Sequence, residues 1–139
     1  MANFPSFFRV AFQNVDTSST LLNAHLAAVI VKGGSVVSVG INRPKMNSYV
    51  HFYGNHENCG SVHAEIDAIF RARRKVDLRG SKMYVARLTK RGQVGLAMPC
   101  KMCRRALQRY GIKRVYYTVD ENTHAEMRLR PVKTNWKKR

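Results

Sequence analysis

Two different spacings of apolar residues alternate along the N-terminal part of the chain. Within Phe4–Val15 the apolar residues recur at helical spacing, which predicts an amphipathic helix. Leu26–Val31 is a continuous apolar run and Val36–Val39 is rich in β-branched residues, and both patterns are typical of strands. Gly33 and Gly34 lie between these runs, so we expect a hairpin with a tight turn. Because Leu26–Val31 is apolar throughout, we expect this strand to be covered on both faces, as in a layered α/β domain.

Helices and strands are predicted to alternate through the rest of the chain. Gly111 is a typical C′ glycine, so we expect a helix to end at Tyr110. The long connection Asn42–Gly60 is expected to be functional or mobile, as loops of this length in compact domains often are. The pattern weakens after Asp120. In chain order, the pattern predicts a helix over Val62–Arg74, a strand over Lys82–Leu88, a helix over Cys100–Tyr110 and a strand over Val115–Val119.

Length and charge narrow the class of protein. A chain of 139 residues can bury a sizeable core, so we expect a single domain over residues 1–139 with a basic C-terminal tail from about residue 127. The chain has 25 Lys and Arg against eight Asp and Glu, which gives a net charge of +17 and a pI near 10.6. This excess favours a partner rich in phosphate, a nucleotide or a nucleic acid, over a merely well-solvated surface.

Targeting signals are not recognisable in the sequence. A bilayer crossing needs an apolar span of about 20 residues, and the chain has none. Residues 1–12 carry Arg9 within their apolar stretch and lack a small-residue cleavage site, so they do not resemble a signal peptide. Two of the three cysteines stand at metal-binding spacing, which argues against a disulfide framework. We therefore expect a cytoplasmic protein in a reducing compartment, with no membrane partner.

Two short motifs far apart in the chain carry the candidate chemistry. The first is His63-Ala64-Glu65 and the second is Pro99-Cys100-Lys101-Met102-Cys103. Catalytic zinc takes three protein ligands and keeps a fourth position for water, and His63, Cys100 and Cys103 supply three. Glu65 is close enough in sequence to handle the protons of that water. The order H-x-E followed by P-C-x-x-C is the signature of zinc-dependent nucleobase deaminases.

The predicted elements explain why these residue types suit a catalytic zinc. Cys100 and Cys103 are three residues apart at the start of one predicted helix, so both side chains leave the same face. His63 and Glu65 stand at the start of another, and the positive ends of two helix dipoles favour thiolates and a hydroxide. Zinc lowers the pKa of its water to about 7, so we expect a zinc-bound hydroxide to attack the base. Glu65 would carry protons to the ring nitrogen and the leaving ammonia.

A closed zinc site is the competing interpretation. Cys59 lies four residues before His63 and could complete a structural set of three cysteines and one histidine, and His51 and His56 are nearby. In that arrangement Glu65 has no role. We prefer the open three-ligand site, which gives Glu65 a role and leaves Cys59 as a buried or loop thiol, and we expect one zinc per chain.

Four segments together resemble the cytidine/deoxycytidylate deaminase superfamily. The resemblance extends over about Ala27–Thr118 and implies a three-layer αβα fold around a five-stranded mixed sheet. It also implies hydrolytic deamination of a cytosine or adenine base. The segments are His63-Ala64-Glu65-Ile66-Asp67-Ala68-Ile69, Met83-Tyr84-Val85, Pro99-Cys100-Lys101-Met102-Cys103 and Gly111-Ile112-Lys113-Arg114-Val115-Tyr116-Tyr117.

The resemblance also implies residues that bind substrate. Asn42 matches an asparagine that holds the sugar or base in related deaminases, although it also suits an ordinary turn. Backbone contacts to the base and hydroxide are implied at Ala64 and Cys100, and Pro99 is assigned to the substrate side of the site. The chain departs from many family members at residues 86–98, an extended excursion.

The excursion contains Arg87, Lys90 and Arg91. We expect it near the site entrance, in reach of a substrate phosphate.

Three functions follow in order of preference. The first is a zinc-dependent hydrolase that deaminates a cytosine-type nucleoside or nucleotide, as in nucleotide metabolism. The second is a deaminase of polynucleotides, tRNA or single-stranded nucleic acid, whose backbone the basic surface would contact. The third is a non-catalytic zinc-stabilised module that binds nucleic acid. We also expect a homo-oligomer.

Overall fold

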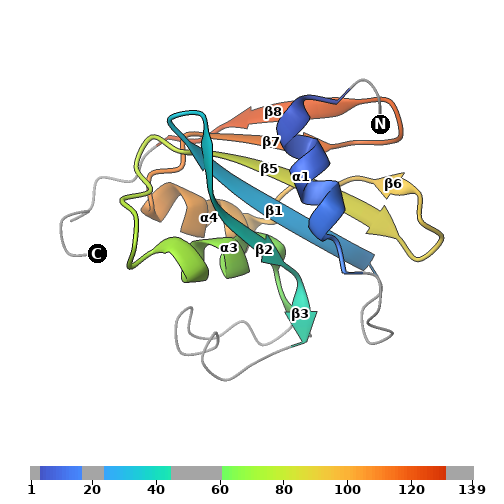
Figure 1. Cartoon of the computed structure of the whole chain (residues 1–139), viewed down its shortest axis with the longest axis horizontal. Helices are drawn as coiled ribbons and strands as arrows, with labels where there is room; N and C mark the ends of the chain where they lie inside the picture. Colours follow the sequence, from blue (N-terminus) through green and yellow to red (C-terminus); the bar gives the residue numbers. More distant parts are fainter. Residues whose placement is uncertain (1–3, 17–23, 45–60, 131–139) are drawn as a thin grey trace.

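The computed structural model describes residues 4–16, 24–44 and 61–130. None of the helices within these ranges is long and apolar enough to cross a membrane. The helices are α1 (Ser6–Asn14), α3 (Ala64–Ala72) and α4 (Lys101–Arg109), and the strands are β1 (Ala24–Lys32), β2 (Ser35–Ile41), β3 (Arg43–Pro44), β4 (Ser61–Val62), β5 (Lys82–Thr89), β6 (Val94–Gly95), β7 (Arg114–Thr118) and β8 (His124–Arg128) (Figure 1).

Five main strands in the order β2-β1-β5-β7-β8, with the short β6 as a sixth beside β5, form one mixed sheet. The pair β5–β7 is parallel, whereas β1–β2, β1–β5 and β7–β8 are antiparallel. The short β6 folds back on the end of β5, and β3 pairs with β4 in a separate ladder. The five-stranded mixed sheet expected from the family resemblance is confirmed.

The strand directions explain why α3 and α4 begin at the same edge of the sheet. Both β2 and β5 are antiparallel to β1, which lies between them, so they run in the same direction. The connection from β2 to β5 contains α3, and the connection from β5 to β7 contains α4. A connection between two strands that run in the same direction leaves the sheet at the carboxyl end of the first strand. The N-termini of α3 and α4 therefore both lie at the carboxyl edge of the sheet.

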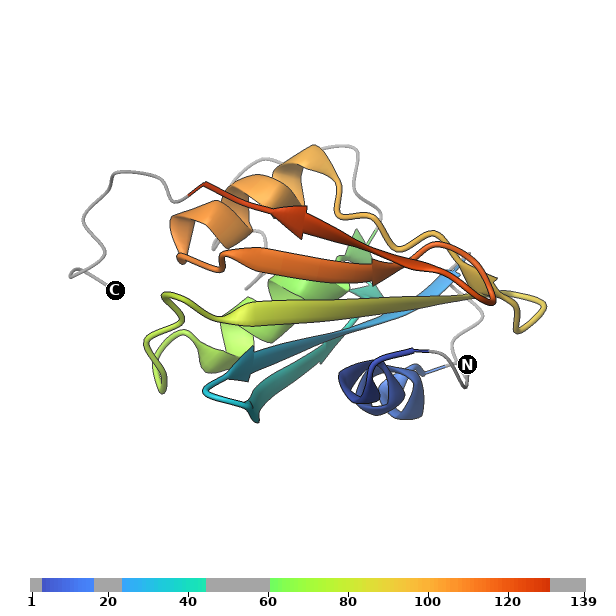
Figure 2. The same cartoon turned by 90° about the horizontal axis from the view of Figure 1, so that it is seen from above.

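Helices cover both faces of the sheet, with α1 on one side and α3 and α4 on the other (Figure 2). Side chains alternate between the faces of a strand. On β1, Ala27 and Val29 pack in the cluster of α1, whereas Ala28 and Ile30 pack in the cluster of α3 and α4. The prediction that this strand is covered on both faces is confirmed, because each alternate set of its apolar residues has its own helical layer.

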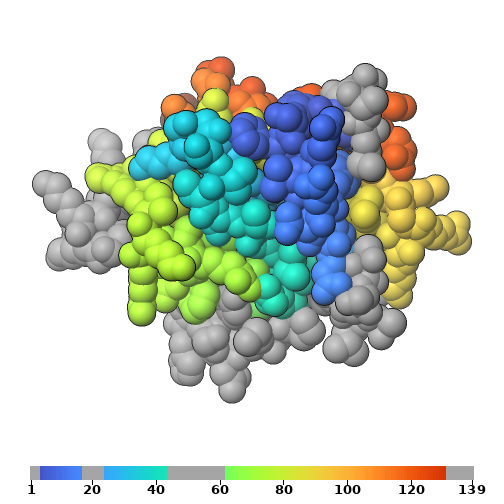
Figure 3. All heavy atoms as spheres, in the orientation of Figure 1, coloured from blue at the N-terminus to red at the C-terminus, as the bar shows by residue number. Residues whose placement is uncertain are grey.

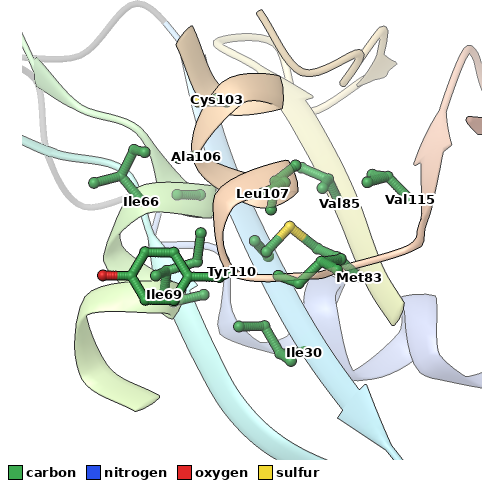
Figure 4. Packing of buried hydrophobic residues seen from close by; sticks show 14 of the residues in the cluster. Ile30, Ile66, Ile69, Met83, Val85, Cys103, Ala106, Leu107, Tyr110 and Val115 are labelled. Atoms are coloured by element: carbon green, nitrogen blue, oxygen red, sulfur yellow. The ribbon is translucent and has the colours of Figure 1, made fainter. Parts of the chain in front are cut away.

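The larger core lies between the sheet and the pair α3 and α4 (Figure 4). Its largest members are fully buried, and burying one such side chain stabilises the fold by about 1.5–3 kcal/mol. Cys103 belongs to this core, so one metal-ligand candidate is part of the packing itself. The fully buried large residues of this cluster include Ile30, Ile69, Met83, Leu107, Ile112, Val85 and Val115.

One helix start and the C-terminal strand differ from the sequence predictions in ways that the structure explains. The helix predicted from Val62 begins at Ala64, because residues 61–62 pair with β3 instead. The C-terminal strand β8 was not predicted, because its residues alternate between exposed and half-buried and only Met127 is strongly apolar. Residues 127 and 128, expected as the start of the basic tail, are part of β8, and Leu129 is buried in the larger core. Residues 131–139 of that tail lie outside the described residues.

Gly40 sets how closely β2 approaches α3. A Cβ at this position would lie 2.3 Å from the Ala68 nitrogen and 2.4 Å from the Ala64 oxygen, both backbone atoms. Backbone atoms of a packed helix cannot rotate away as a side chain does. A side chain at Gly40 would therefore push the N-terminal turn of α3 off the sheet.

We expect Gly40→Ala to lower the free energy of unfolding by more than the ~1–3 kcal/mol typical of overpacking. Urea denaturation followed by circular dichroism measures this. Gly95→Ala is the matched control, because its Cβ would meet the flexible Arg87 side chain at 3.4 Å, an ordinary contact. Equal losses in the two variants would show that the approach of β2 to α3 is not constrained at Gly40.

Candidate metal centre

The two zinc-ligand motifs meet at the carboxyl edge of the sheet. His63 is the N-cap of α3 and Cys100 is the N-cap of α4, both with extended backbone. The Cys103 amide, in the first turn of α4, donates a hydrogen bond to Cys100 Sγ at 3.5 Å. Each motif thus occupies a helix start, as the sequence predicted, and the topology brings the two starts together.

The three candidate ligands have the spacing of a zinc site. His63 Nδ1 lies 3.2 Å from Cys103 Sγ and 3.5 Å from Cys100 Sγ. All three ligand atoms lie within 4.8 Å of one another, and they form the metal-binding group that stands out among the described residues. Tetrahedral zinc with Zn–S near 2.3 Å and Zn–N near 2.0 Å holds such atoms about 3.5 Å apart. The donor set and its spacing therefore fit the ion.

The protein favours the metal-binding form of Cys100, the thiolate, whereas His63 must lose a proton when a metal binds. Hydrogen bonds from Cys103 and then from His63 lower the pKa of the Cys100 thiol to about 3, although burial acts in the opposite direction. The hydrogen bond with Cys100 raises the pKa of His63. Both shifts reflect a thiolate next to an imidazolium. A divalent cation placed between them takes over the role of that positive charge.

Glu65 lies in the first turn of α3 and is 3% exposed. Burial raises the pKa of its carboxyl group, and hydrogen bonding with the Cys103 side chain and the nearby His63 partly oppose this shift. A buried carboxyl group next to a metal centre is suited to hold and release a proton. Glu65 thus lies beside the candidate metal ligands, and its role as proton carrier stays a proposal.

The buried residue Asp67, not singled out in the sequence, fixes the start of α3. Its Oδ2 accepts hydrogen bonds from the Ile41 amide at 3.0 Å, from Arg43 Nε at 3.2 Å and from Arg71 Nε at 3.1 Å. Charged hydrogen bonds of this kind contribute about 1.5–3 kcal/mol each when buried. A signal was available in the sequence, since Asp67 is an acid within an otherwise apolar helical stretch and lies four residues before Arg71.

Thr118 performs the same task for α4. Its hydroxyl donates to the Gly95 oxygen at 2.8 Å and accepts from the Arg87 amide at 3.3 Å, and its carbonyl accepts from the Ala97 amide at 2.8 Å. Thr118 is the last residue of β7 and is fully buried. The segment between β6 and Cys100 is therefore anchored to the end of β7.

The three predicted substrate-binding residues lie at this edge in different settings. Asn42 extends the ladder of β1 with its side chain, since Oδ1 accepts from the Leu26 amide at 2.9 Å and Nδ2 donates to the Ala24 oxygen at 2.7 Å. Ala64, the first residue of α3, and Pro99, directly before Cys100, are both buried. Asn42 thus has a structural role in addition to the binding role that the resemblance implies.

The excursion at residues 86–98 is a hairpin formed by the end of β5 and by β6. Arg87 is half-buried and its guanidinium donates to the Leu96 oxygen at 3.4 Å. Lys90 and Arg91 are exposed at the turn. The hairpin leads directly into the Pro99-Cys100 segment, so it lies at the same edge as the site. His51, His56 and Cys59, considered for a closed site, lie outside the described residues.

Comparison with known proteins is consistent with this geometry. The family model for the cytidine and deoxycytidylate deaminase zinc-binding region matches residues 1–119. The chain belongs to this family. His63, Cys100 and Cys103 are its zinc-binding triad, and the protein is a member of the zinc-dependent deaminase superfamily. A search of curated proteins finds no significant match.

Solved structures show the same fold at low sequence identity. The dCMP deaminase of cyanophage S-TIM5 in apo form is 21% identical, with a TM-score of 0.59 over 84% of this chain and 82% of that one. The same phage enzyme in complex with dCMP and dUMP is 20% identical, with a TM-score of 0.54 over 81% and 77%. A cytidine deaminase from Burkholderia pseudomallei is 21% identical, with a TM-score of 0.56 over 79% of both chains.

We expect Cys100→Ser and Cys103→Ser to purify with far less than one zinc per chain. Structural zinc can contribute on the order of 10 kcal/mol to a fold, so both variants should also unfold at a lower temperature. Elemental analysis and thermal unfolding with and without chelator measure the two effects. Cys59→Ser is the matched control and should keep its zinc. X-ray absorption that reports three sulfurs and one nitrogen would contradict the open site and assign Cys59 as a ligand.

Proposed function

We propose that this protein is a zinc-dependent hydrolytic deaminase of a cytosine-type nucleoside or nucleotide. The observation that carries the proposal is the buried Glu65 carboxyl group beside the three ligands that the described residues supply. A structural zinc needs no buried acid at its side, whereas hydrolysis needs a proton carrier there. Supporting this choice, the structural neighbours include proteins named dCMP deaminase and cytidine deaminase.

The reaction replaces an amino group on the base by oxygen, consuming water and releasing ammonia. Zinc, when bound by His63, Cys100 and Cys103, supplies a Lewis acid that makes water a nucleophile near neutral pH. Glu65 takes the proton of that water, passes it to the ring nitrogen and delivers a proton to the departing ammonia. Its low exposure suits this role, because a dry carboxyl group exchanges protons with substrate rather than with bulk water.

The substrate contacts proposed from the sequence have a physical basis at the helix start. The first N–H groups of a helix have no partner within it, so the amides at and after Ala64 are donors for a polar ligand. Asn42 uses one amide hydrogen and one lone pair on β1, which leaves one further donor and one further acceptor for a sugar or base. The backbone at Pro99, beside Cys100, is the third proposed contact.

Location and assembly stay predictions. Two of the three cysteines are zinc ligands, which suits the reducing cytoplasm expected from the sequence. A homo-oligomer is expected, as before. A polynucleotide substrate is the second candidate function, favoured by the net charge of +17.

We expect Glu65→Gln to retain zinc and thermal stability while turnover falls by at least the ~10²–10⁴-fold attributed to a general acid–base group. Glutamine keeps the size of the side chain but cannot carry a proton. Glu121→Gln, the same change at an exposed residue that accepts from the Val94 amide, is the control and should keep full turnover. Loss of zinc in Glu65→Gln, or undiminished turnover, would contradict the proposed role.

Ammonia release from separate incubations with cytidine, CMP, dCMP, adenosine and guanine tests the substrate class. We expect release from at least one cytosine compound and none from adenosine or guanine. A coupled assay for ammonia, with the uracil product identified by chromatography, measures it. Release from adenosine alone, or from no small molecule by the zinc-loaded protein, would contradict this part of the proposal.

A further inference from the structure

The positive charge is concentrated in the part of the chain that forms α4 and its neighbours. Residues 78–119 contain eleven Lys and Arg and no Asp or Glu. This stretch includes both cysteine ligands of the zinc. The segment has no carboxylates of its own. Its Arg79 and Arg114 pair with Asp77 and Glu126 outside it, and the other positive charges, those of α4 included, are available to a partner.

One face of α4 forms a basic stripe. Lys101, Arg105 and Arg109 are exposed and follow one another at intervals of four residues, and we call them the α4 stripe. The opposite face of the helix, with Cys103 and Leu107, is fully buried in the larger core. The fold therefore holds the stripe rigidly toward solvent, on the side of the sheet away from α1 (Figure 2).

The α4 stripe is electrostatically unfavourable for the helix itself. Like charges four residues apart repel, and Lys101 adds a positive charge to the first turn, where the helix dipole is already positive. No carboxylate within the described residues lies in ion-pair distance of Lys101, Arg105 or Arg109. The helix dipole favours Arg109 in the last turn, but the repulsion along the stripe is not offset by a carboxylate in the part of the chain that the structure describes. A function outside the fold therefore accounts for the stripe better.

The stripe begins at the zinc site and an apolar rim lies beside that beginning. Lys101 directly follows the ligand Cys100. In the segment that enters the site, Leu96 is 50% exposed and Met98 is 47% exposed, while Ala97 between them is buried. Exposed apolar side chains next to a row of cations suit a ligand with flat apolar bases and a charged backbone.

We propose that the α4 stripe binds the phosphate backbone of a single-stranded nucleic acid that passes the zinc site. Successive stripe residues are about 6 Å apart along the helix axis. A stacked strand carries a charge about every 3.4 Å and an extended strand carries them further apart, so each cation can meet its own phosphate. A single strand is chosen because its bases are free to turn toward Leu96 and Met98. This binding deepens the second candidate function, a polynucleotide substrate, by naming the surface that would hold the strand, and it requires no turnover.

The test compares two double variants that each remove two arginine charges. Arg105→Gln with Arg109→Gln changes the α4 stripe, and glutamine is a good helix former that preserves α4. Arg9→Gln with Arg128→Gln is the matched control. Arg9 lies on α1, which covers the face of the sheet opposite α4; Figure 3 shows α1 beside β2. Arg128 directly precedes Leu129, which packs in the larger core on the α4 side, so the side chain of Arg128 lies on the α1 side as well. The probe is a fluorescent thymidine oligonucleotide of about 20 nucleotides, which carries no amino group to hydrolyse.

Fluorescence anisotropy of the zinc-loaded proteins over a range of NaCl concentrations gives the affinity and its salt slope. For two lost phosphate contacts, we expect the slope of log K against log[salt] to become less steep by about 1.4. With equal affinities at 1 M salt as the reference, the affinity at 0.1 M salt should then fall about 25-fold. The control double variant should lose less than about threefold. Circular dichroism checks that both variants are folded.

Three results would overturn the proposal. The first is an unchanged slope and affinity in the α4 double variant, and the second is an equal loss in the control. The third is an α4 double variant that no longer binds phosphatidylserine vesicles but still binds the oligonucleotide. That result would assign the α4 stripe to a lipid surface. Failure of the proposed function is distinguishable, because it appears as absent ammonia release from nucleosides while thymidine-oligonucleotide binding is intact.

Discussion

The contact between His63 Nδ1 and Cys103 Sγ, 3.2 Å long, joins two helix starts that are forty residues apart in the chain. Cys103 is fully buried in the larger core and His63 is half-buried, so neither group can move far to meet a metal ion. The packing of α3 and α4 on the sheet therefore fixes the geometry of the ligands before any ion binds. A site prepared in this way loses little conformational entropy when zinc enters, and the stability of the fold and the affinity for zinc become linked.

Two buried carboxyl groups on one turn of α3 have opposite environments. Asp67 is surrounded by donors, with one amide and two guanidinium groups converging on a single oxygen, so it ties α3 to the neighbouring elements. Glu65 lies against the metal ligands, and its burial raises its pKa. The difference follows from helix geometry, since positions two residues apart leave α3 about 200° apart. One acid therefore faces β2 and holds the helix, while the other faces the metal and is suited to carry a proton.

Charge is separated between the inside and the outside of this protein. The acids that the site needs are buried in α3, whereas the segment from β5 to β7 has only positive charges and shows several of them to solvent. Self-repulsion on this scale destabilises a compact state, and the zinc-linked packing around Cys103 is one source of compensation. A basic surface that starts at the metal centre would raise the local concentration of phosphate-bearing ligands there, whether single nucleotides or polymers.

The sequence by itself determined the local elements and the chemical identity of the site. These features depend on residues only a few positions apart, so they can be recognised without knowing the fold. They are the helical spacing of apolar residues, the Gly33-Gly34 hairpin and the two motifs. The sequence did not show β8, because its residues alternate only weakly in hydrophobicity and form a strand through pairing with β7. It also did not show the hydrogen bonds on Asp67, whose partners on β2 and β3 lie 24 to 26 residues away. Only the tertiary structure decided that α3 and α4 begin at one edge of the sheet, because that depends on the direction of β2 and β5 relative to β1.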